Sequence, residues 1–270
     1  MTELDRTALL EGVVEAALRA GRAILDIYQS DFAVQVKPDA SPVTEADTAA
    51  EAIILAALAR LAPGVPVVAE EEVAAGRTPQ VGEMFFLVDP LDGTKEFVQR
   101  RGDFTVNVAL IEQGRPTLGV VYPPVRGRLY AADVRAGAAW AADVSDDRLG
   151  ARTPLRVRTP GEAYVVVASK SHPTPGTETY LSDCEVESRI SVGSSLKFCL
   201  VAAGEADLYP RPSPTSEWDT AAGHAVLAAA GGAVFGPDGT PLVYGKPGFF
   251  NPGFVACGPF TPKPIGPFIG

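Results

Sequence analysis

Two aspartates stand three positions apart in VDPLDGT, residues 88 to 94, directly after the apolar run MFFLV. Asp89 ends what we expect to be a buried strand, and Asp92 precedes Gly93 and Thr94. Carboxylates in such a turn can bind hard cations through oxygen, and free amides at a helix start can bind a phosphate oxygen. Asp-Pro and Asp-Gly are also ordinary turn sequences, so this segment alone leaves both interpretations open.

Three other acidic segments could contribute to the same chemistry, although each has a simpler explanation. They are Glu70, Glu71 and Glu72 after the apolar run VPVVA, Asp219 in EWDTAAG, and Thr44, Glu45 and Asp47 in SPVTEAD. The glutamates could be a solvated charge run, and Asp219 is expected at the N-cap of a helix. The third segment reads as a helix cap or capping box. A capping carboxylate can also bind a metal, because it has two oxygens.

The expected secondary structure divides the chain into helices and short strands. Apolar spacing predicts helices over the first thirty residues, 47–61, near 174–183, from 194, and over 218–232. Strands are expected at 65–69, 84–88, 104–111, 117–122, 128–134 and 163–169, with short Gly- and Pro-containing connections typical of antiparallel hairpins. The polar stretch 142–162 separates a predicted N-terminal α+β lobe, 1–150, from a C-terminal lobe, 151–270.

Composition restricts the class of protein. The 270 residues are 46% hydrophobic and 21% charged, which is typical of a globular protein. A net charge of -10 argues against a nucleic-acid polymer as partner, so a phosphate ligand would need positive charge from bound metal or local side chains. Three cysteines without a C-x-x-C pair predict neither disulfides nor a zinc knuckle.

No membrane span or secretion signal is expected from the sequence, because it lacks a long apolar run and an apolar N-terminal segment. We therefore expect a cytoplasmic protein. The sequence leaves open peripheral contact with the inner membrane face and assembly as a homodimer.

Taken in order, these segments resemble the lithium-sensitive, magnesium-dependent phosphomonoesterase superfamily typified by inositol monophosphatase. Its D-P-[ILV]-D-G-T signature stands intact at 89–94 and its W-D-x-A-A-G signature at 218–223. Within it, DPLDGTKEF and GSSLKFCLVAAGEADLYPR look most like the bacterial 3'(2'),5'-bisphosphate nucleotidase (CysQ-type) branch. Lys95 and Glu96 replace the T-N of inositol monophosphatases. The likeness covers about 41–254 and implies a layered αβαβα sandwich.

The resemblance also implies the roles of individual residues. Two or more Mg²⁺ ions would share the site. Glu70, Asp89 and the Leu91 carbonyl would bind the first, and Asp89, Asp92 and Asp219 the second. Thr94, paired with Asp47, would orient the attacking water together with Glu70. The phosphate would lie on the Gly93 and Thr94 amides, with Asp219 also beside the substrate.

The implied reaction is removal of the 3'-phosphate of adenosine 3',5'-bisphosphate, or of its sulfated relative, by metal-activated water. Ser194, Ser195 and Lys197 in GSSLK suit a ribose or a second phosphate, unless they are only a helix cap and a solvated lysine. His224 and Cys199 are expected to be packed core residues, and His172 lies in a loop-like segment. The alternative is an inositol-1-phosphatase or broad sugar phosphatase with the same metal site.

Overall fold

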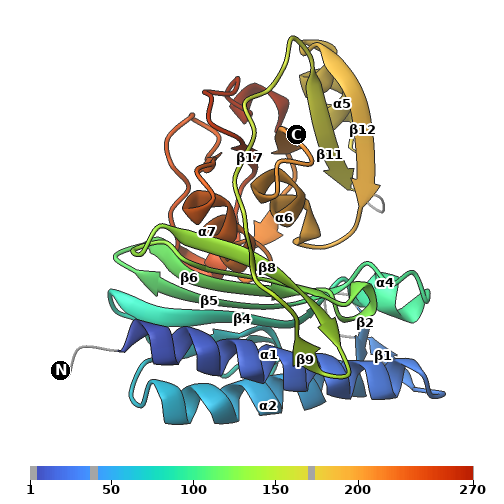
Figure 1. The fold of residues 1–270 in the computed structure, drawn as a ribbon, viewed down its shortest axis with the longest axis vertical. Coiled ribbons are helices and arrows are strands. Elements are labelled where there is room, and N and C mark those ends of the chain that lie inside the picture. The colour runs from blue at the N-terminus through green and yellow to red at the C-terminus, as the bar shows by residue number, and fades with distance from the viewer. Residues whose placement is uncertain (1–4, 37–41, 170–173, 270) are drawn as a thin grey trace.

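The computed structural model describes residues 5–36, 42–169 and 174–269, and its elements form five layers (Figure 1). Helices α1 (Arg6–Tyr28) and α2 (Glu45–Leu61) lie side by side against one face of a large sheet. Helices α6 (Leu196–Ala202) and α7 (Ala221–Ala229) cover its other face and separate it from a smaller sheet. Helix α5 (Pro175–Ser182) packs on the far side of the smaller sheet. The predicted αβαβα sandwich is confirmed.

The large sheet is mostly an antiparallel meander, as the short connections predicted. Its path is β10-β8-β7-β6-β5-β4-β3, and β9 pairs with β8. The strands are β3 (Val67–Ala69), β4 (Met84–Asp92), β5 (Thr105–Glu112), β6 (Arg115–Tyr122), β7 (Arg128–Asp133), β8 (Ala138–Ser145), β9 (Arg148–Leu149) and β10 (Thr153–Pro154). Only the β3–β4 pair in this sheet, among the residues described, is parallel.

The smaller sheet has the order β12-β11-β13-β17-β15. Its strands are β11 (Tyr164–Ser169), β12 (Val186–Val192), β13 (Leu208–Arg211), β15 (Ala233–Phe235) and β17 (Phe254–Cys257). Two further pairs are β1 (Val34–Val36) with β2 (Pro42–Thr44), and β14 (Thr215–Ser216) with β16 (Phe250–Asn251). Short helices are α3 (Glu70–Ala74), α4 (Thr94–Val98), η1 (Pro124–Arg126), η2 (Pro247–Phe249) and η3 (Gly266–Phe268).

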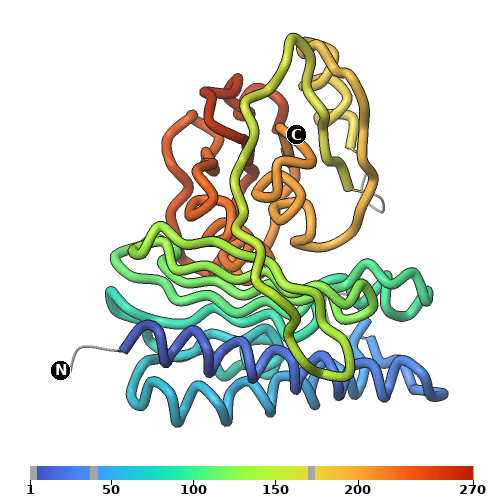
Figure 2. Tube along the Cα trace, in the orientation of Figure 1, coloured from blue at the N-terminus to red at the C-terminus, as the bar shows by residue number. Residues whose placement is uncertain are grey.

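The core between the two sheets contains residues from both halves of the chain. Phe85 and Leu87 of β4 belong to the same buried cluster as Phe198 of α6 and Val226 of α7. Figure 2 shows the segment after β10 running along the side of the molecule from the large sheet to the smaller one. The division at residue 150 falls in the connection before this segment and stays a prediction.

Two predicted core residues are buried. Cys199 is fully buried in α6, and His224 packs in α7 with Nδ1 3.0 Å from the Tyr244 hydroxyl. Burial lowers the pKa of His224 to about 3, so it is neutral at physiological pH. His172 lies outside the described residues.

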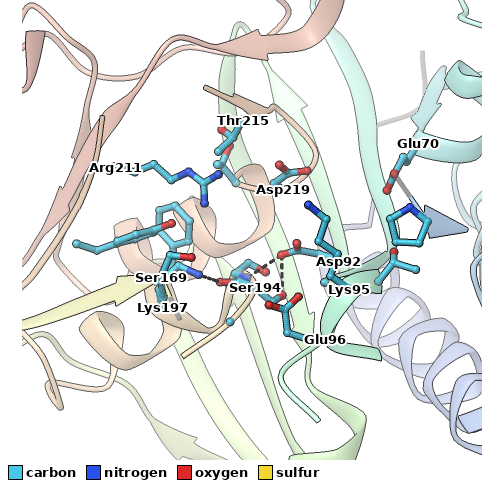
Figure 3. A pocket seen from close by; sticks show the side chains of 18 residues that line it. Glu70, Asp92, Lys95, Glu96, Ser169, Ser194, Lys197, Arg211, Thr215 and Asp219 are labelled. Atoms are coloured by element: carbon cyan, nitrogen blue, oxygen red, sulfur yellow. Dashed lines mark hydrogen bonds between the residues drawn. The ribbon is translucent and has the colours of Figure 1, made fainter. Parts of the chain in front are cut away.

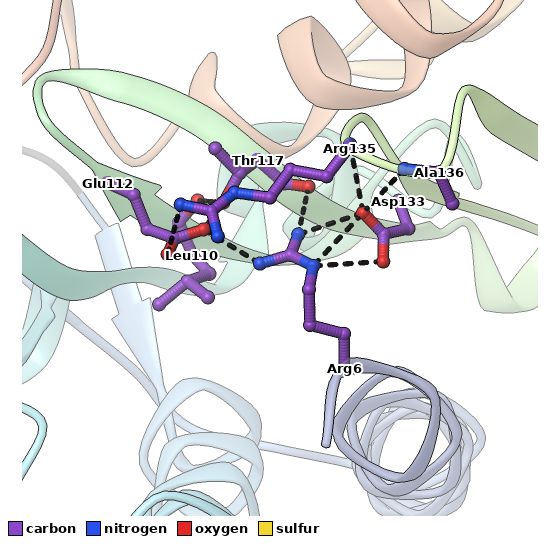
Figure 4. A network of polar contacts seen from close by, with 7 residues as sticks. All are labelled: Arg6, Leu110, Glu112, Thr117, Asp133, Arg135 and Ala136. Atoms are coloured by element: carbon purple, nitrogen blue, oxygen red, sulfur yellow. Dashed lines mark hydrogen bonds and ion pairs between the residues drawn. The ribbon is translucent and has the colours of Figure 1, made fainter. Parts of the chain in front are cut away.

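The N-terminal helix is fixed to the large sheet by an ion-pair network at one end (Figure 4). Arg6 of α1 pairs with Glu112 at 2.7 Å and with Asp133 at 2.9 Å, and donates to the Thr117 carbonyl at 2.7 Å. Arg135 pairs with the second oxygen of Glu112 at 2.7 Å. These contacts hold α1 in place along strands β5 to β7.

Helix α7 approaches strand β6 very closely, and a glycine permits this contact. A Cβ placed on Gly119 would lie 2.5 Å from the Ala222 carbonyl oxygen and 2.6 Å from Ala225 Cβ. Both neighbours belong to the helix rather than to a flexible side chain, so they cannot move independently. A side chain at 119 would push α7 away from the sheet, and the Asp219 turn lies just before that helix.

We expect Gly119→Ala to destabilise the protein by about 1–3 kcal/mol, because overpacking forces the α7 backbone to shift. Chemical denaturation measures the change in the free energy of unfolding. Gly82→Ala is the matched control, because a Cβ there would meet nothing within 4 Å. Equal stability of the two variants would contradict the close approach.

Candidate active site

The parallel β3–β4 pair brings the first two acidic segments together. Ala69 pairs with Val88, so the next residues, Glu70 and Asp89, emerge at the same edge of the sheet. Burial of Asp89 is almost complete, at 2% exposure, and its Oδ1 accepts the Leu91 N–H at 3.0 Å. The two acids come close because each follows one member of the last parallel pair, Ala69 with Val88.

The DPLDGT turn leaves β4 through an irregular stretch. The pairing of β4 with β5 shifts register between Asp89 and Asp92, which turns both aspartates towards the site end of the sheet. Gly93 follows with φ of 95°, in the left-handed region, and α4 begins at Thr94. A Cβ at Gly93 would also lie 3.0 Å from the Asp103 carbonyl oxygen, so glycine is required for space as well.

The start of α2 holds Thr94 from the other side of the sheet. Thr94 Oγ1 donates to Asp47 Oδ1 at 3.1 Å and lies 3.2 Å from the Leu91 carbonyl oxygen. The other Asp47 oxygen accepts from the Thr44 N–H and hydroxyl, both at 2.8 Å, and Thr44 caps α2. The structure therefore contains both the predicted capping box and the expected Thr94–Asp47 pair.

Asp219 reaches the site from the second half of the chain, but the prediction that it caps α7 is wrong. The helix begins at Ala221, and the amides of Thr220 and Ala221 bond back to the Glu217 carbonyl in a turn. Asp219 Oδ2 accepts the upstream Ser216 N–H at 3.1 Å instead. The carboxylate thus faces the site rather than the helix amides.

The GSSLK segment also differs from the prediction that a helix starts at 194. Ser194 has φ of 56°, in the left-handed region, so α6 begins two residues later. Asp92 Oδ2 accepts the Ser194 hydroxyl at 2.6 Å and the Ser195 N–H at 2.7 Å. Ser195 occupies the N-cap position of α6, but its Oγ donates to Asn107 Oδ1 at 2.6 Å and makes no hydrogen bond to a helix amide. The serines join β4 and β5 to the smaller-sheet half.

A single pocket is lined by most of the predicted site residues (Figure 3). These are Glu70, Asp92, Gly93, Thr94, Ser194, Ser195, Lys197 and Asp219, with Asp89 buried beside them. In Figure 3, Asp219 lies between Arg211 and Glu70, and the Lys95 side chain lies near Asp92. The sequence segments from both halves therefore converge on one cavity.

The opposite wall of the pocket is basic. Lys197 is 2% exposed and donates to the Ser194 carbonyl at 2.6 Å, so its interpretation as a solvated lysine is wrong. Arg211, at the end of β13, lines the same wall, and its buried Nε has no hydrogen-bond partner among the described residues. The sequence analysis missed Arg211, because it is the pairing of β13 with β11 and β17 that brings YPR to the pocket. The pocket thus combines carboxylates with two inward-facing cations.

The chain matches the model of the inositol monophosphatase family over residues 5–253. It belongs to this family. It is 47% identical over 249 residues to the Escherichia coli K12 protein named 3'(2'),5'-bisphosphate nucleotidase CysQ, covering 91% of this chain and 98% of that one. The resemblance to the family and to its CysQ branch is confirmed.

Solved structures support the same conclusion about the fold. The crystal structure of CysQ from Bacteroides thetaiotaomicron is 38% identical, with a TM-score of 0.77 over 93% of this chain and 97% of that one. The Thermotoga maritima inositol monophosphatase, 22% identical, shares the fold with a TM-score of 0.76 over 95% and 94% of the two chains. No helix in the described part of the chain is long and apolar enough to cross a membrane.

Burial and mutual repulsion dominate the electrostatics of the acidic wall. Burial raises the pKa of Asp89 well above its usual value, and the charges of Glu70, Asp92 and Asp219 raise it further. Burial also raises the pKa of Asp219, and Asp92 and Glu70 add to the effect. Carboxylates held together in this way are unfavourable without a cation.

This donor set suits a hard divalent cation, and family members are typically Mg²⁺-dependent. Within the described residues, no three acidic, histidine or cysteine side chains are already arranged around one point that could hold an ion. Asp92 is instead hydrogen-bonded to the serines of the opposite wall. The carboxylates therefore approach the pocket from several sides without enclosing a common centre.

We expect Asp89→Asn to stabilise the metal-free protein at neutral pH by about 1 kcal/mol, or roughly 2–4 °C in melting temperature. A raised folded-state pKa means that ionisation of Asp89 destabilises the fold as pH rises above its unfolded pKa, and asparagine cannot ionise. Thermal melts in EDTA, followed by titration with Mg²⁺, measure this effect.

Mg²⁺ should stabilise the wild type more than the Asp89→Asn variant, because only the wild type has the full set of carboxylates. Asp31→Asn, at an exposed position, is the control for loss of one negative charge. A lower melting temperature of Asp89→Asn in EDTA would show that the buried aspartate is not electrostatically unfavourable.

Proposed function

We propose that this protein is a 3'(2'),5'-bisphosphate nucleotidase that removes the 3'-phosphate of adenosine 3',5'-bisphosphate, giving AMP. The observation that carries the proposal is one pocket with a carboxylate wall for cations and a basic wall suited to a second phosphate. The 47% identity to the E. coli CysQ nucleotidase over nearly the whole chain supports the same assignment. The sulfated relative of this substrate, which carries a sulfate on its 5'-phosphate and likewise loses its 3'-phosphate, is a second substrate under this proposal.

The carboxylate wall would hold two or more Mg²⁺ ions. Glu70, Asp89 and the Leu91 carbonyl are the proposed ligands of one, and Asp89, Asp92 and Asp219 of another. When bound, Mg²⁺ would lower the pKa of a coordinated water and neutralise charge on the phosphate. The chain's contribution is to hold these oxygens close together despite their repulsion, which the packing of the two sheets makes possible.

Thr94 and Glu70 are proposed to orient the attacking water. Thr94 Oγ1 donates a hydrogen bond to Asp47, so the lone pairs of this oxygen can accept a hydrogen bond from a water molecule. The Glu70 carboxylate can accept the water's other proton. This arrangement favours direct attack on phosphorus without a phosphoenzyme, since no nucleophilic side chain is required.

The phosphates of the substrate would occupy different parts of the pocket. The amides of Gly93 and Thr94 are proposed to hold the 3'-phosphate beside the metal ligands. Ser194, Ser195 and Lys197 would contact the ribose, and Arg211 would bind the 5'-phosphate with its unpaired Nε. Asp219 lies between these regions and would contact both a cation and the substrate.

Phosphate release from adenosine 3',5'-bisphosphate and from inositol 1-phosphate, measured in parallel, tests the proposal. We expect phosphate release to be much faster from the nucleotide than from inositol 1-phosphate. This activity should require Mg²⁺ and should be lost when Li⁺ is added or in the Asp89→Asn variant. Preference for inositol 1-phosphate would retain the metal site and overturn the substrate assignment. No turnover of either would overturn the proposed reaction.

Arg211→Gln should raise KM for adenosine 3',5'-bisphosphate about 10- to 150-fold, since a hydrogen bond to a charged group contributes about 1.5–3 kcal/mol. Hydrolysis of 3'-AMP, which lacks the 5'-phosphate, should change much less. Steady-state kinetics with both substrates makes the comparison. Arg128→Gln, which removes a half-buried arginine on β7 that pairs with Asp143 and does not line the pocket, is the control. Equal losses on both substrates would contradict a role in binding the 5'-phosphate.

A further inference from the structure

The short helix α3 begins with Glu70 but has no capping side chain of its own. Ala69 occupies its N-cap position and offers no side-chain acceptor to the first helical amides. The other end of α3 is held locally, because Ala75 N bonds to the Glu71 carbonyl and Arg77 pairs with Glu72 at 2.6 Å. What fixes the start of α3 must come from another element.

That contact comes from α2, which packs beside α3. Glu51 Oε2 accepts the Glu71 N–H at 2.9 Å, and Glu51 is only 4% exposed. The bond satisfies one of the amides that a helix start leaves free. Glu51 therefore caps α3 from a distance of 20 residues in the chain, one position after Glu70.

Glu51 lies one helical turn after Asp47, on the same buried face of α2. Residues four apart on a helix are neighbours on its surface. Asp47 binds Thr94 after β4, whereas Glu51 binds the amide that follows Glu70 after β3. One rigid helix thus sets the distance between the two segments that carry Thr94 and Glu70.

We propose that Glu51 is a positioning residue that aligns Glu70 with Thr94 and with the other carboxylates through the start of α3. The inference rests on the proposed function, in which Glu70 binds a cation and orients the water. The role requires an acceptor oxygen at the right distance, not a negative charge. Glu51 is buried close to Glu70, Glu71 and Glu72, where a further charge is electrostatically unfavourable.

Three substitutions of Glu51 separate the effect of side-chain length from the effect of negative charge. Glu51→Gln keeps an acceptor of the same length without charge, Glu51→Asp keeps the charge but is one methylene shorter, and Glu51→Leu removes both. We expect the protection of the Glu71 amide and the affinity for Mn²⁺ to be close to wild type in Glu51→Gln, lower in Glu51→Asp and lowest in Glu51→Leu. If Glu51 acted through its charge, as a ligand or a base, Glu51→Asp would stay closer to wild type than Glu51→Gln in these measurements. Glu45→Leu, exposed on the same helix, is the control.

The first measurement is hydrogen exchange of the α3 amides in EDTA, which needs neither metal nor turnover. The Glu71 amide should exchange about five- to tenfold faster in Glu51→Asp and Glu51→Leu, corresponding to one hydrogen bond, and at the wild-type rate in Glu51→Gln. Unchanged exchange in both Glu51→Asp and Glu51→Leu, or fast exchange in Glu51→Gln, would overturn the inference. Should Glu51→Leu fail to fold, the comparison of Gln with Asp still decides.

The second measurement is Mn²⁺ binding by electron paramagnetic resonance without substrate, with Mn²⁺ as the probe. The dissociation constant should rise about five- to tenfold in Glu51→Asp and stay within about twofold of wild type in Glu51→Gln. A purely structural residue would lower the melting temperature without changing Mn²⁺ affinity of the folded protein, and that result would overturn the inference.

The two proposals fail in different ways. If the wild-type protein binds no Mn²⁺, the proposed function is overturned, and so is the inference that Glu51 aligns Glu70. A wild type that binds Mn²⁺ and hydrolyses the bisphosphate, with Glu51→Asp equal to wild type, would overturn only the role of Glu51.

Discussion

Repulsion between buried carboxylates is the constraint on which the rest of the structure depends. Asp89 is almost fully buried next to the charges of Glu70, Asp92 and Asp219. It shares a hydrogen bond with Glu70, but these carboxylates repel one another when they are ionised. The fold must supply the free energy that holds them, through the packing of two sheets and the helices between them. Among the described residues the carboxylates do not surround one point, so a cation that binds them has to compete with Ser194 and Ser195 for Asp92.

The architecture meets this constraint by bringing the carboxylates in from three parts of the fold: Glu70 at the start of α3, Asp89 and Asp92 on β4, and Asp219 before α7. Glu70 and Asp89 come directly after the last register pair of the parallel β3–β4 contact, Ala69 with Val88, in an otherwise antiparallel sheet. Asp219 comes from a turn fixed by buried Glu217, whose carboxylate accepts the Gly245 N–H at 2.7 Å.

The sequence predicted the parts of this arrangement that depend on local spacing. The DPLDGT and WDTAAG motifs, the capping box at Thr44 and Asp47, and the apolar strands of the meander are all recognisable within a few residues of chain. The site residues that these motifs contain line or adjoin one pocket, although their individual roles stay proposals. The five-layer fold followed from family resemblance rather than from periodicity.

What the sequence could not predict depends on contacts between distant segments. Arg211 is an ordinary arginine until β13 pairs with β17, and Glu51 looks like any helix glutamate until α3 packs against α2. The left-handed backbone of Ser194 moved the start of α6, and the turn at 217–220 moved the start of α7. Local propensity describes isolated segments, whereas these features arise from tertiary packing.

The bond between Asp92 and Ser194 joins parts of the chain that are 102 residues apart. Asp92 belongs to the large sheet, whereas Ser194 precedes the helix that packs under the smaller one. A 2.6 Å hydrogen bond weakens steeply when its atoms separate, so a displacement of about 1 Å between the layers would free this carboxylate to rotate. The orientation of the Asp92 carboxylate therefore depends on the distance between the large sheet and the α6 layer. Any contact of Asp92 with a ligand in the pocket depends on the same distance.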